Sequence, residues 1–122
     1  MDLLLDTHTF LWWDSGKLER PVARYIQAAG DVYVSAASAW EIAIKASLGK
    51  IEARGSVAKA CADYGFLPLA ISLEHAEAVR SLPRHHGDPF DRILVAQAML
   101  EKLTIVTKDP LIERYAIAVA WD

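Results

Sequence analysis

The chain alternates short apolar runs with longer segments of helical periodicity, and this alternation limits the folds it can adopt. Apolar and β-branched residues cluster at positions 3–5, 32–34, 103–107 and 117–120, with helical patterns between them. The run at 3–5 is three consecutive leucines, as expected for a strand covered on both faces. Alternating strands and helices favour parallel pairing with helices on both sides of the sheet. The sequence therefore predicts an α/β fold, a three-layer α/β/α sandwich with a central, mostly parallel sheet.

The expected helices begin and end at recognisable signals. Ser56 is a plausible N-cap and Gly65 a plausible C-cap for one of them. The stretch at 66–71 is ambiguous around Pro68. Without repeats, linkers or low-complexity tracts, residues 1–122 are expected to form one domain. Helical patterns cover residues 7–14, 21–29, 36–48, 56–64, 72–82 and 89–102, and one or two further turns cover 111–115.

Charge and cysteine content exclude several classes of protein. With 16 acidic and 13 basic residues the net charge is −3, so any binding to a polyanion must be local. The single cysteine, Cys61, excludes an internal disulfide and a multi-cysteine metal site, which fits the reducing cytoplasm. Residues 1–5 have neither the pattern of a signal peptide nor that of a membrane span. We therefore expect a cytoplasmic protein without membrane association.

Four acidic residues stand beside strand ends or at helix starts. Asp6 and Asp109 follow strands, whereas Glu41 and Asp91 belong to helices that open on the same edge. Ligands in open α/β sheets bind beyond the carboxyl ends of the strands. Carboxylates gathered there would repel one another unless a cation neutralised them, and hard oxygen ligands select Mg²⁺ or Mn²⁺. This arrangement suits metal-assisted hydrolysis of phosphodiesters.

Each acid taken alone also has an ordinary structural explanation. Asp88 and Asp91 fit the cap and first turn of a helix, and for Asp88 the cap is preferred. Asp109 before Pro110 is a natural cap. Glu41 and Lys45 form an i, i+4 pair, although the apolar helix around Glu41 demands a partner for this carboxylate. Only Asp6 has no comparably strong structural role. Asp6→Asn or Asp91→Asn is expected to abolish activity and to leave the metal-free fold intact or more stable.

Basic residues lie close to these acids in the sequence. They could contact a polyanion, although surface scatter explains any single one equally well. The adjacent His85 and His86 lack the spacing of a metal site, so they are interpreted as phosphate or backbone partners, or as exposed loop residues. The candidate phosphate contacts are Lys45, His85, His86, Arg92 and Lys108.

Trp12 and Trp13, with the apolar residues beside them, most simply belong to the core or to a subunit contact. Base stacking is the less favoured alternative, because stacking platforms usually adjoin basic grooves. The aliphatic excess also leaves room for an apolar groove that binds a partner helix.

The motifs LLLDTH, VSAASAWEIAIKASLGK, HHGDPFDRILVAQA and TIVTKD resemble the PIN-domain family, and more narrowly the VapC-like toxins of bacterial type II toxin–antitoxin systems. The resemblance covers nearly the whole chain. It implies a Mg²⁺- or Mn²⁺-dependent endoribonuclease that acts on RNA, is commonly a homodimer and is inhibited by a small antitoxin protein. The family's metal-binding and catalytic acids correspond to Asp6, Glu41, Asp91 and Asp109.

The resemblance also bears on neighbouring residues and on the alternatives. Thr7 and Thr107 match polar positions near the family's site, whereas Asp88 could be a ligand, a supporting residue or a cap. A phosphoacceptor domain is disfavoured because the chain lacks paired acids after its first strand. A catalytically silent PIN-like module that only binds RNA or protein remains the alternative.

Overall fold

A single parallel sheet forms the centre of the molecule. The computed structural model describes residues 1–52 and 55–121. Five strands occur in the described part, in the order β3-β2-β1-β4-β5, and every neighbouring pair is parallel. The fold class predicted from the sequence is confirmed, and the sheet is entirely parallel. The strands are β1 (Leu3–Leu5), β2 (Val32–Ser35), β3 (Leu67–Leu69), β4 (Thr104–Val106) and β5 (Val119–Ala120).

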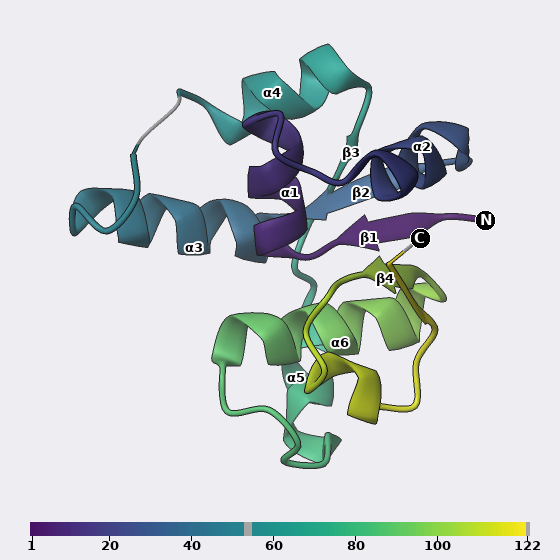
Figure 1. Ribbon diagram of the computed structural model, residues 1–122. Coiled ribbons are helices and arrows are strands. Elements are labelled where there is room, and N and C mark those ends of the chain that lie inside the picture. Colours follow the sequence, from purple (N-terminus) through teal and green to yellow (C-terminus); the bar gives the residue numbers. More distant parts are fainter. Residues whose placement is uncertain (53–54, 122) are drawn as a thin grey trace.

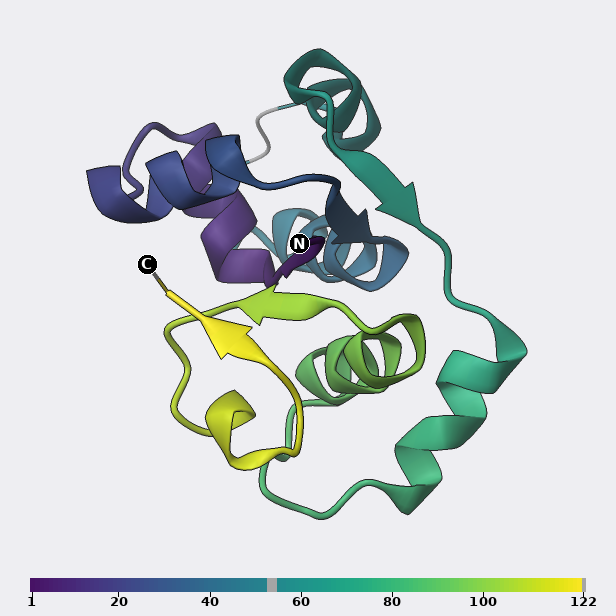
Figure 2. The same ribbon diagram turned by 90° about the vertical axis from the view of Figure 1, so that its right-hand side faces the viewer.

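Helices cover both faces of the sheet (Figure 1). On one side lie α1, α2 and α4, and on the other lie α5, α6 and the short helix η2; Figure 2 shows the sheet between these layers, with β3 and β5 at opposite edges. The helix α3 follows β2 directly and extends away from the sheet. The helices are α1 (Thr7–Asp14), α2 (Arg20–Ala28), α3 (Ala36–Ser47), α4 (Val57–Tyr64), α5 (Leu73–Ala78) and α6 (Pro89–Glu101), with 3₁₀ turns η1 (Val79–Ser81) and η2 (Ile112–Arg114).

The hydrophobic core is divided into two clusters by the sheet. Leu4 and Ile105 belong to the cluster beneath α6, whereas Leu3, Leu5 and Val106 belong to the cluster beneath α1 and α2. All three leucines of β1 are fully buried. This follows from the alternation of side chains along a strand whose two faces are both covered. The prediction that both faces of this strand are covered is confirmed.

The register of the sheet decides which polar residues meet at its carboxyl edge. Leu5 pairs with Val34 on one side and with Val106 on the other. The next residues, Asp6, Ser35 and Thr107, consequently leave the three central strands at the same level. The sheet thus brings the ends of distant segments together at one edge.

Most expected elements are found within one or two residues of their predicted bounds. The ambiguous stretch at 66–71 contains the edge strand β3, where Pro68 pairs with Val34. Proline is tolerated there because an edge strand leaves some of its N–H positions unpaired. The helix expected at 72–82 is α5 followed by η1. Within the described residues, no helix is long and apolar enough to cross a membrane.

Candidate metal centre

Asp6 lies between β1 and α1 and uses both oxygens of its side chain. Its Oδ1 accepts a hydrogen bond from the backbone N–H of Thr9 at 2.8 Å and so caps α1. Its Oδ2 accepts the hydroxyl of Thr107 at 2.5 Å. The expectation that Asp6 lacks a structural role is therefore wrong, because α1 begins immediately after the strand and needs a cap. An asparagine could keep the cap but would offer no second oxygen to Thr107, so it is not expected to stabilise the fold.

Glu41 projects from the middle of α3 and is 3% exposed. Its Oε2 accepts a hydrogen bond from Lys45 Nζ at 2.7 Å, which is the partner that the apolar helix required. This bond is the main cause that raises the pKa of Lys45. The other oxygen, Oε1, is buried and has no hydrogen-bond partner among the described residues. A buried, unpaired carboxylate oxygen is costly and invites a ligand.

Asp91 occupies the first turn of α6 and has a strongly perturbed pKa. Burial raises the pKa of Asp91 to about 7, and the negative charge of Asp88 adds to this effect. His86 opposes the shift, whereas Glu41 and Asp6 raise the pKa further. Glu41 and Asp6 are therefore close enough to Asp91 to disfavour its ionised form. Such perturbation is characteristic of functional sites.

Asp109 follows β4 and meets Asp91 through a shared histidine. His86 Nε2 lies 2.8 Å from Asp109 Oδ2 and 3.1 Å from Asp91 Oδ2. One potential ligand atom from each of these three residues lies within 4.8 Å of the others. Within the described residues, Asp6 and Glu41 fall outside this tighter group.

Sequence reasoning missed the position of His86 between two carboxylates. Ligand-spacing rules detect pairs on one helix or in one short loop, but Asp109 is 23 residues away along the chain. The ring is oriented locally, because Nδ1 accepts the backbone N–H of Asp88 at 3.1 Å. The pair His85-His86, one residue before DPFDR, was a visible signal, although nothing in the sequence said which carboxylates His86 would meet.

The supporting polar residues have distinct positions. Asp88 caps α6 by accepting the backbone N–H groups of Phe90 and Asp91, as preferred from the sequence. Thr107 holds Asp6 and also accepts the N–H of Asp109 at 3.0 Å. Thr7 instead donates its hydroxyl to Ser38 at 3.0 Å, which joins α1 to α3. Thr107 is thus the hydroxyl that positions the acids.

Of the candidate phosphate contacts, some are held by other parts of the protein and one is exposed. The Arg92 guanidinium donates to backbone carbonyls of Val79 at 3.0 Å and of Pro83 at 2.9 Å. These bonds give Arg92 a structural role that differs from the predicted phosphate contact. The ring of His85 packs on Tyr115 with centroids 5.0 Å apart. Lys108 is exposed beside the acids and is the candidate best placed to meet a phosphate.

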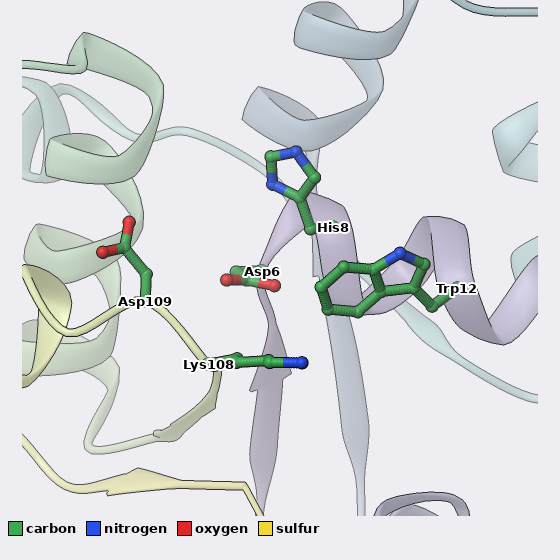
Figure 3. A pocket seen from close by; sticks show the side chains of 5 residues that line it. All are labelled: Asp6, His8, Trp12, Lys108 and Asp109. Carbon is green, nitrogen blue, oxygen red and sulfur yellow. The ribbon is translucent and has the colours of Figure 1, made fainter. Parts of the chain in front are cut away.

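A cavity of about 320 Å³ opens at this edge of the sheet. Asp6, His8, Trp12, Lys108 and Asp109 line it (Figure 3). In Figure 3 Asp6 lies in the middle, between the carboxylate of Asp109 on the left and the indole of Trp12 on the right. The cavity therefore joins the acids to an aromatic wall.

The residues present fit a divalent cation. The donors are mainly carboxylate oxygens, which suit Mg²⁺ or Mn²⁺. The unpaired Oε1 of Glu41 and the raised pKa of Asp91 are two signs of negative charge that lacks compensation. A cation among these acids would relieve both.

A family model described as PIN domain matches residues 3–118. The chain belongs to the PIN domain family. A search of curated proteins gave no match. The match to the family spans the PIN domain from β1 to the residue before β5.

Solved structures resemble this PIN domain over nearly their whole length. A toxin-antitoxin complex from Klebsiella pneumoniae has 21% identity and a TM-score of 0.69, covering 97% of this chain and 95% of the other. A structure of VapBC2 from Rickettsia felis, bound to a DNA fragment from the VapBC2 promoter, has 13% identity and a TM-score of 0.75, with complete coverage of both chains. FitAcB from Neisseria gonorrhoeae has 20% identity and a TM-score of 0.66, covering 96% and 95%. At these identities the likeness establishes the fold.

Proposed function

We propose that this PIN domain is a Mg²⁺- or Mn²⁺-dependent endoribonuclease and the VapC-like toxin of a type II toxin–antitoxin pair, acting in the cytoplasm. The observation that carries the proposal is the electrostatic coupling of Asp91 to Glu41 and Asp6, together with its contact to Asp109 through His86. Membership of the PIN domain family and the toxin–antitoxin complexes among the structural neighbours support it.

In this mechanism Asp6, Glu41, Asp91 and Asp109 would hold the metal. A bound divalent cation supplies Lewis acidity, which activates water and stabilises charge developing on the phosphoryl oxygens. Thr107 fixes the orientation of Asp6 through its hydroxyl. Burial raises the pKa of Asp91 to about 7, so this carboxylate is suited to accept a proton from the attacking water. Lys108 is placed to attract a phosphate of the RNA backbone to this edge of an otherwise acidic protein.

The antitoxin partner would bind an apolar groove between α3, α4 and β3. This groove has a volume of about 550 Å³ and is lined by residues that include Ala39, Val57, Cys61, Phe66 and Leu69. Small and apolar linings of this kind accommodate the apolar face of a helix. We therefore assign the groove to an antitoxin helix.

A separate apolar surface supports the proposed homodimer. Trp40 is 60% exposed and packs edge-on against Phe90, with ring centroids 5.2 Å apart. Ile71 lines the same cavity as these two rings, and the neighbouring Leu73 is 82% exposed. Contiguous exposed apolar side chains mark sites of association. Trp40→Glu is expected to convert a dimer into a monomer in light scattering.

RNA cleavage tests the proposed function directly. The purified protein is incubated with single-stranded RNA in Mg²⁺, in Mn²⁺ and in excess EDTA, and the fragments are separated on a denaturing gel. Asp91→Asn is compared with Asp63→Asn, a matched control on α4 whose carboxylate is exposed and paired with Lys59. We expect metal-dependent cleavage that Asp91→Asn abolishes and Asp63→Asn retains.

Two results would contradict this proposal. Equal cleavage in EDTA would exclude a metal-dependent mechanism. Metal-independent RNA binding without any cleavage would instead identify the silent binding module. Co-expression with the product of a short adjacent gene tests the toxin role, because an antitoxin must suppress the cleavage.

A further inference from the structure

One wall of the cavity consists of aromatic side chains that the hydrolytic chemistry does not use. Trp12 lies on α1 and lines the same cavity as Asp6 and Asp109. Its indole points across the cavity toward Asp6 (Figure 3). An indole beside metal-binding acids contributes nothing to holding a cation, so its position needs another explanation.

The neighbouring tryptophan shows what a structural indole looks like on this helix. Trp13 packs against Phe66 with ring centroids 5.3 Å apart and belongs to a hydrophobic cluster. Trp12 belongs to neither hydrophobic cluster formed by the described residues. Its ring contacts are His8 at 5.9 Å and Trp121 at 5.8 Å. The prediction that both tryptophans belong to the core or to a subunit contact is therefore met by the core packing of Trp13, whereas Trp12 lies outside both clusters.

A cation accompanies the indole. Lys108 Nζ lies 5.6 Å from the centroid of Trp12 and 5.8 Å from that of Trp121, in the corner between two rings set edge-on. Its side chain is 60% exposed and only 3.9 Å from Glu19, so it can exchange these weak contacts for a stronger anion. The basic neighbour that a stacking platform requires is thus present beside Trp12.

We propose that Trp12 is the stacking platform for one unpaired nucleobase of the RNA, next to the phosphodiester that is cleaved, while Lys108 contacts a phosphate of the same strand. Base–aromatic stacking combined with a neighbouring cation is the common mode of binding single strands. The cavity volume of about 320 Å³ falls at the lower end of ligand sites, roughly 300–1,000 Å³, which suits one base. A stacked base must be unpaired, so the site selects single-stranded RNA. This inference rests on the proposed ribonuclease function.

Cleavage kinetics on two matched single-stranded substrates test the stacking of a base on Trp12. The substrate is a short single-stranded RNA containing a site that the wild type cleaves, and a second version lacks the base beside the scissile phosphate. Trp12→Ala is expected to lower kcat/KM by roughly five- to a hundred-fold, mainly through KM. Trp12→Phe should recover most of the loss. Trp13→Phe, on the same helix, should leave KM unchanged.

The base-deleted substrate separates stacking from a general structural effect. Stacking predicts that deleting the base costs the wild type about as much as Trp12→Ala does, and that deletion costs Trp12→Ala almost nothing further. Annealing a complementary strand should remove the advantage of the wild type over Trp12→Ala. Urea denaturation establishes that each variant is folded.

The outcomes distinguish this inference from the proposed function. Suppose that the wild type cleaves RNA, and that the losses of kcat/KM caused by Trp12→Ala and by base deletion multiply when the two are combined. The stacking proposal is then wrong, whereas the ribonuclease proposal is retained. Equal kcat/KM for the folded Trp12→Ala variant and the wild type would also contradict stacking, and would indicate that Trp12 binds a protein partner instead of a base. If the wild type cleaves no RNA in any metal, both proposals fall.

Discussion

Thr107 donates its hydroxyl to Asp6 Oδ2 at 2.5 Å, joining the ends of β4 and β1 across 101 positions of sequence. The same hydroxyl oxygen accepts the backbone N–H of Asp109. One side chain therefore orients one predicted metal ligand and fixes the backbone of another.

Removing this hydroxyl is expected to reduce both stability and activity. Thr107→Val leaves buried polar groups without partners and should cost about 1–3 kcal/mol of unfolding free energy. Thr107→Ser should retain most of it. Thr104→Val, on the same strand, is the control because its side chain makes no such bonds. Urea denaturation measures the effect, and an unchanged midpoint for Thr107→Val would contradict it.

Asp91 makes the metal-free protein less stable as the pH rises. The pKa of Asp91 is about 7 in the folded protein, above its ordinary value, so the folded state binds a proton that the unfolded state has already lost. Stability should therefore fall from about pH 4 to pH 7 and stay low above that.

Asparagine at position 91 should remove this dependence. We expect Asp91→Asn to stabilise the EDTA-treated protein by about 1–2 kcal/mol at pH 8 and by little at pH 4. Asp63→Asn serves as the control. Denaturation curves at both pH values measure the change, and a stabilisation larger at pH 4 than at pH 8 would refute the assignment.

Metal binding should compete with the proton on Asp91. Ligands bind metals in their deprotonated form, so Mn²⁺ affinity should be roughly tenfold lower at pH 6 than at pH 8. Calorimetric titration at the two pH values tests this. Identical dissociation constants would mean that Asp91 is not a ligand.

Replacing His86 tests whether this imidazole is a metal ligand or is replaced by the metal between Asp91 and Asp109. Its Nε2 lies between Asp91 and Asp109, where a cation could replace it. Because Mg²⁺ prefers oxygen ligands, we expect His86→Ala to bind Mg²⁺ at least as tightly as the wild type. His85→Ala is the matched control. A loss of Mg²⁺ affinity confined to His86→Ala would instead make this imidazole a ligand.

The Arg92 fork is expected to stabilise the loop before α6. Arg92→Lys cannot reproduce bonds to separate carbonyls and should cost about 1–3 kcal/mol. Arg84→Lys, an exposed neighbour in the same loop, should be neutral. If Arg92→Lys lowered RNA affinity and left stability unchanged, the result would support the sequence-based prediction that Arg92 contacts a phosphate.

The helices and strands could be predicted from the sequence because their signals depend on neighbouring residues. Leu3, Leu4 and Leu5 indicated a fully covered strand, and Asp88 before Pro89 indicated a helix start. Both interpretations depend on neighbours within a few residues, and the structure confirms both. Local patterns could also place Asp6 and Asp109 after strands and Asp91 in the first turn of a helix, whereas Glu41 lies in the middle of α3.

The contacts among these acids depend on strand register, which the local pattern does not specify. Thr107 meets Asp6 only because Val106 pairs with Leu5. His86 meets Asp109 only because the loop before α6 folds back over the end of β4. Asp6 was therefore given no comparably strong structural role, although it accepts the Thr107 hydroxyl. His86 was interpreted as a phosphate or backbone partner or an exposed loop residue; it does accept the backbone N–H of Asp88, but its Nε2 also lies between two carboxylates.

The pairing of β1 with β4 has a consequence for synthesis of the protein. Leu5 emerges from the ribosome long before Val106, its partner in the sheet. Domains fold as units during translation, so Asp6 stays without Thr107 and Asp109 until β4 and the residues after it have been made. The four predicted metal ligands therefore cannot assemble on a nascent chain that lacks the segment after β4.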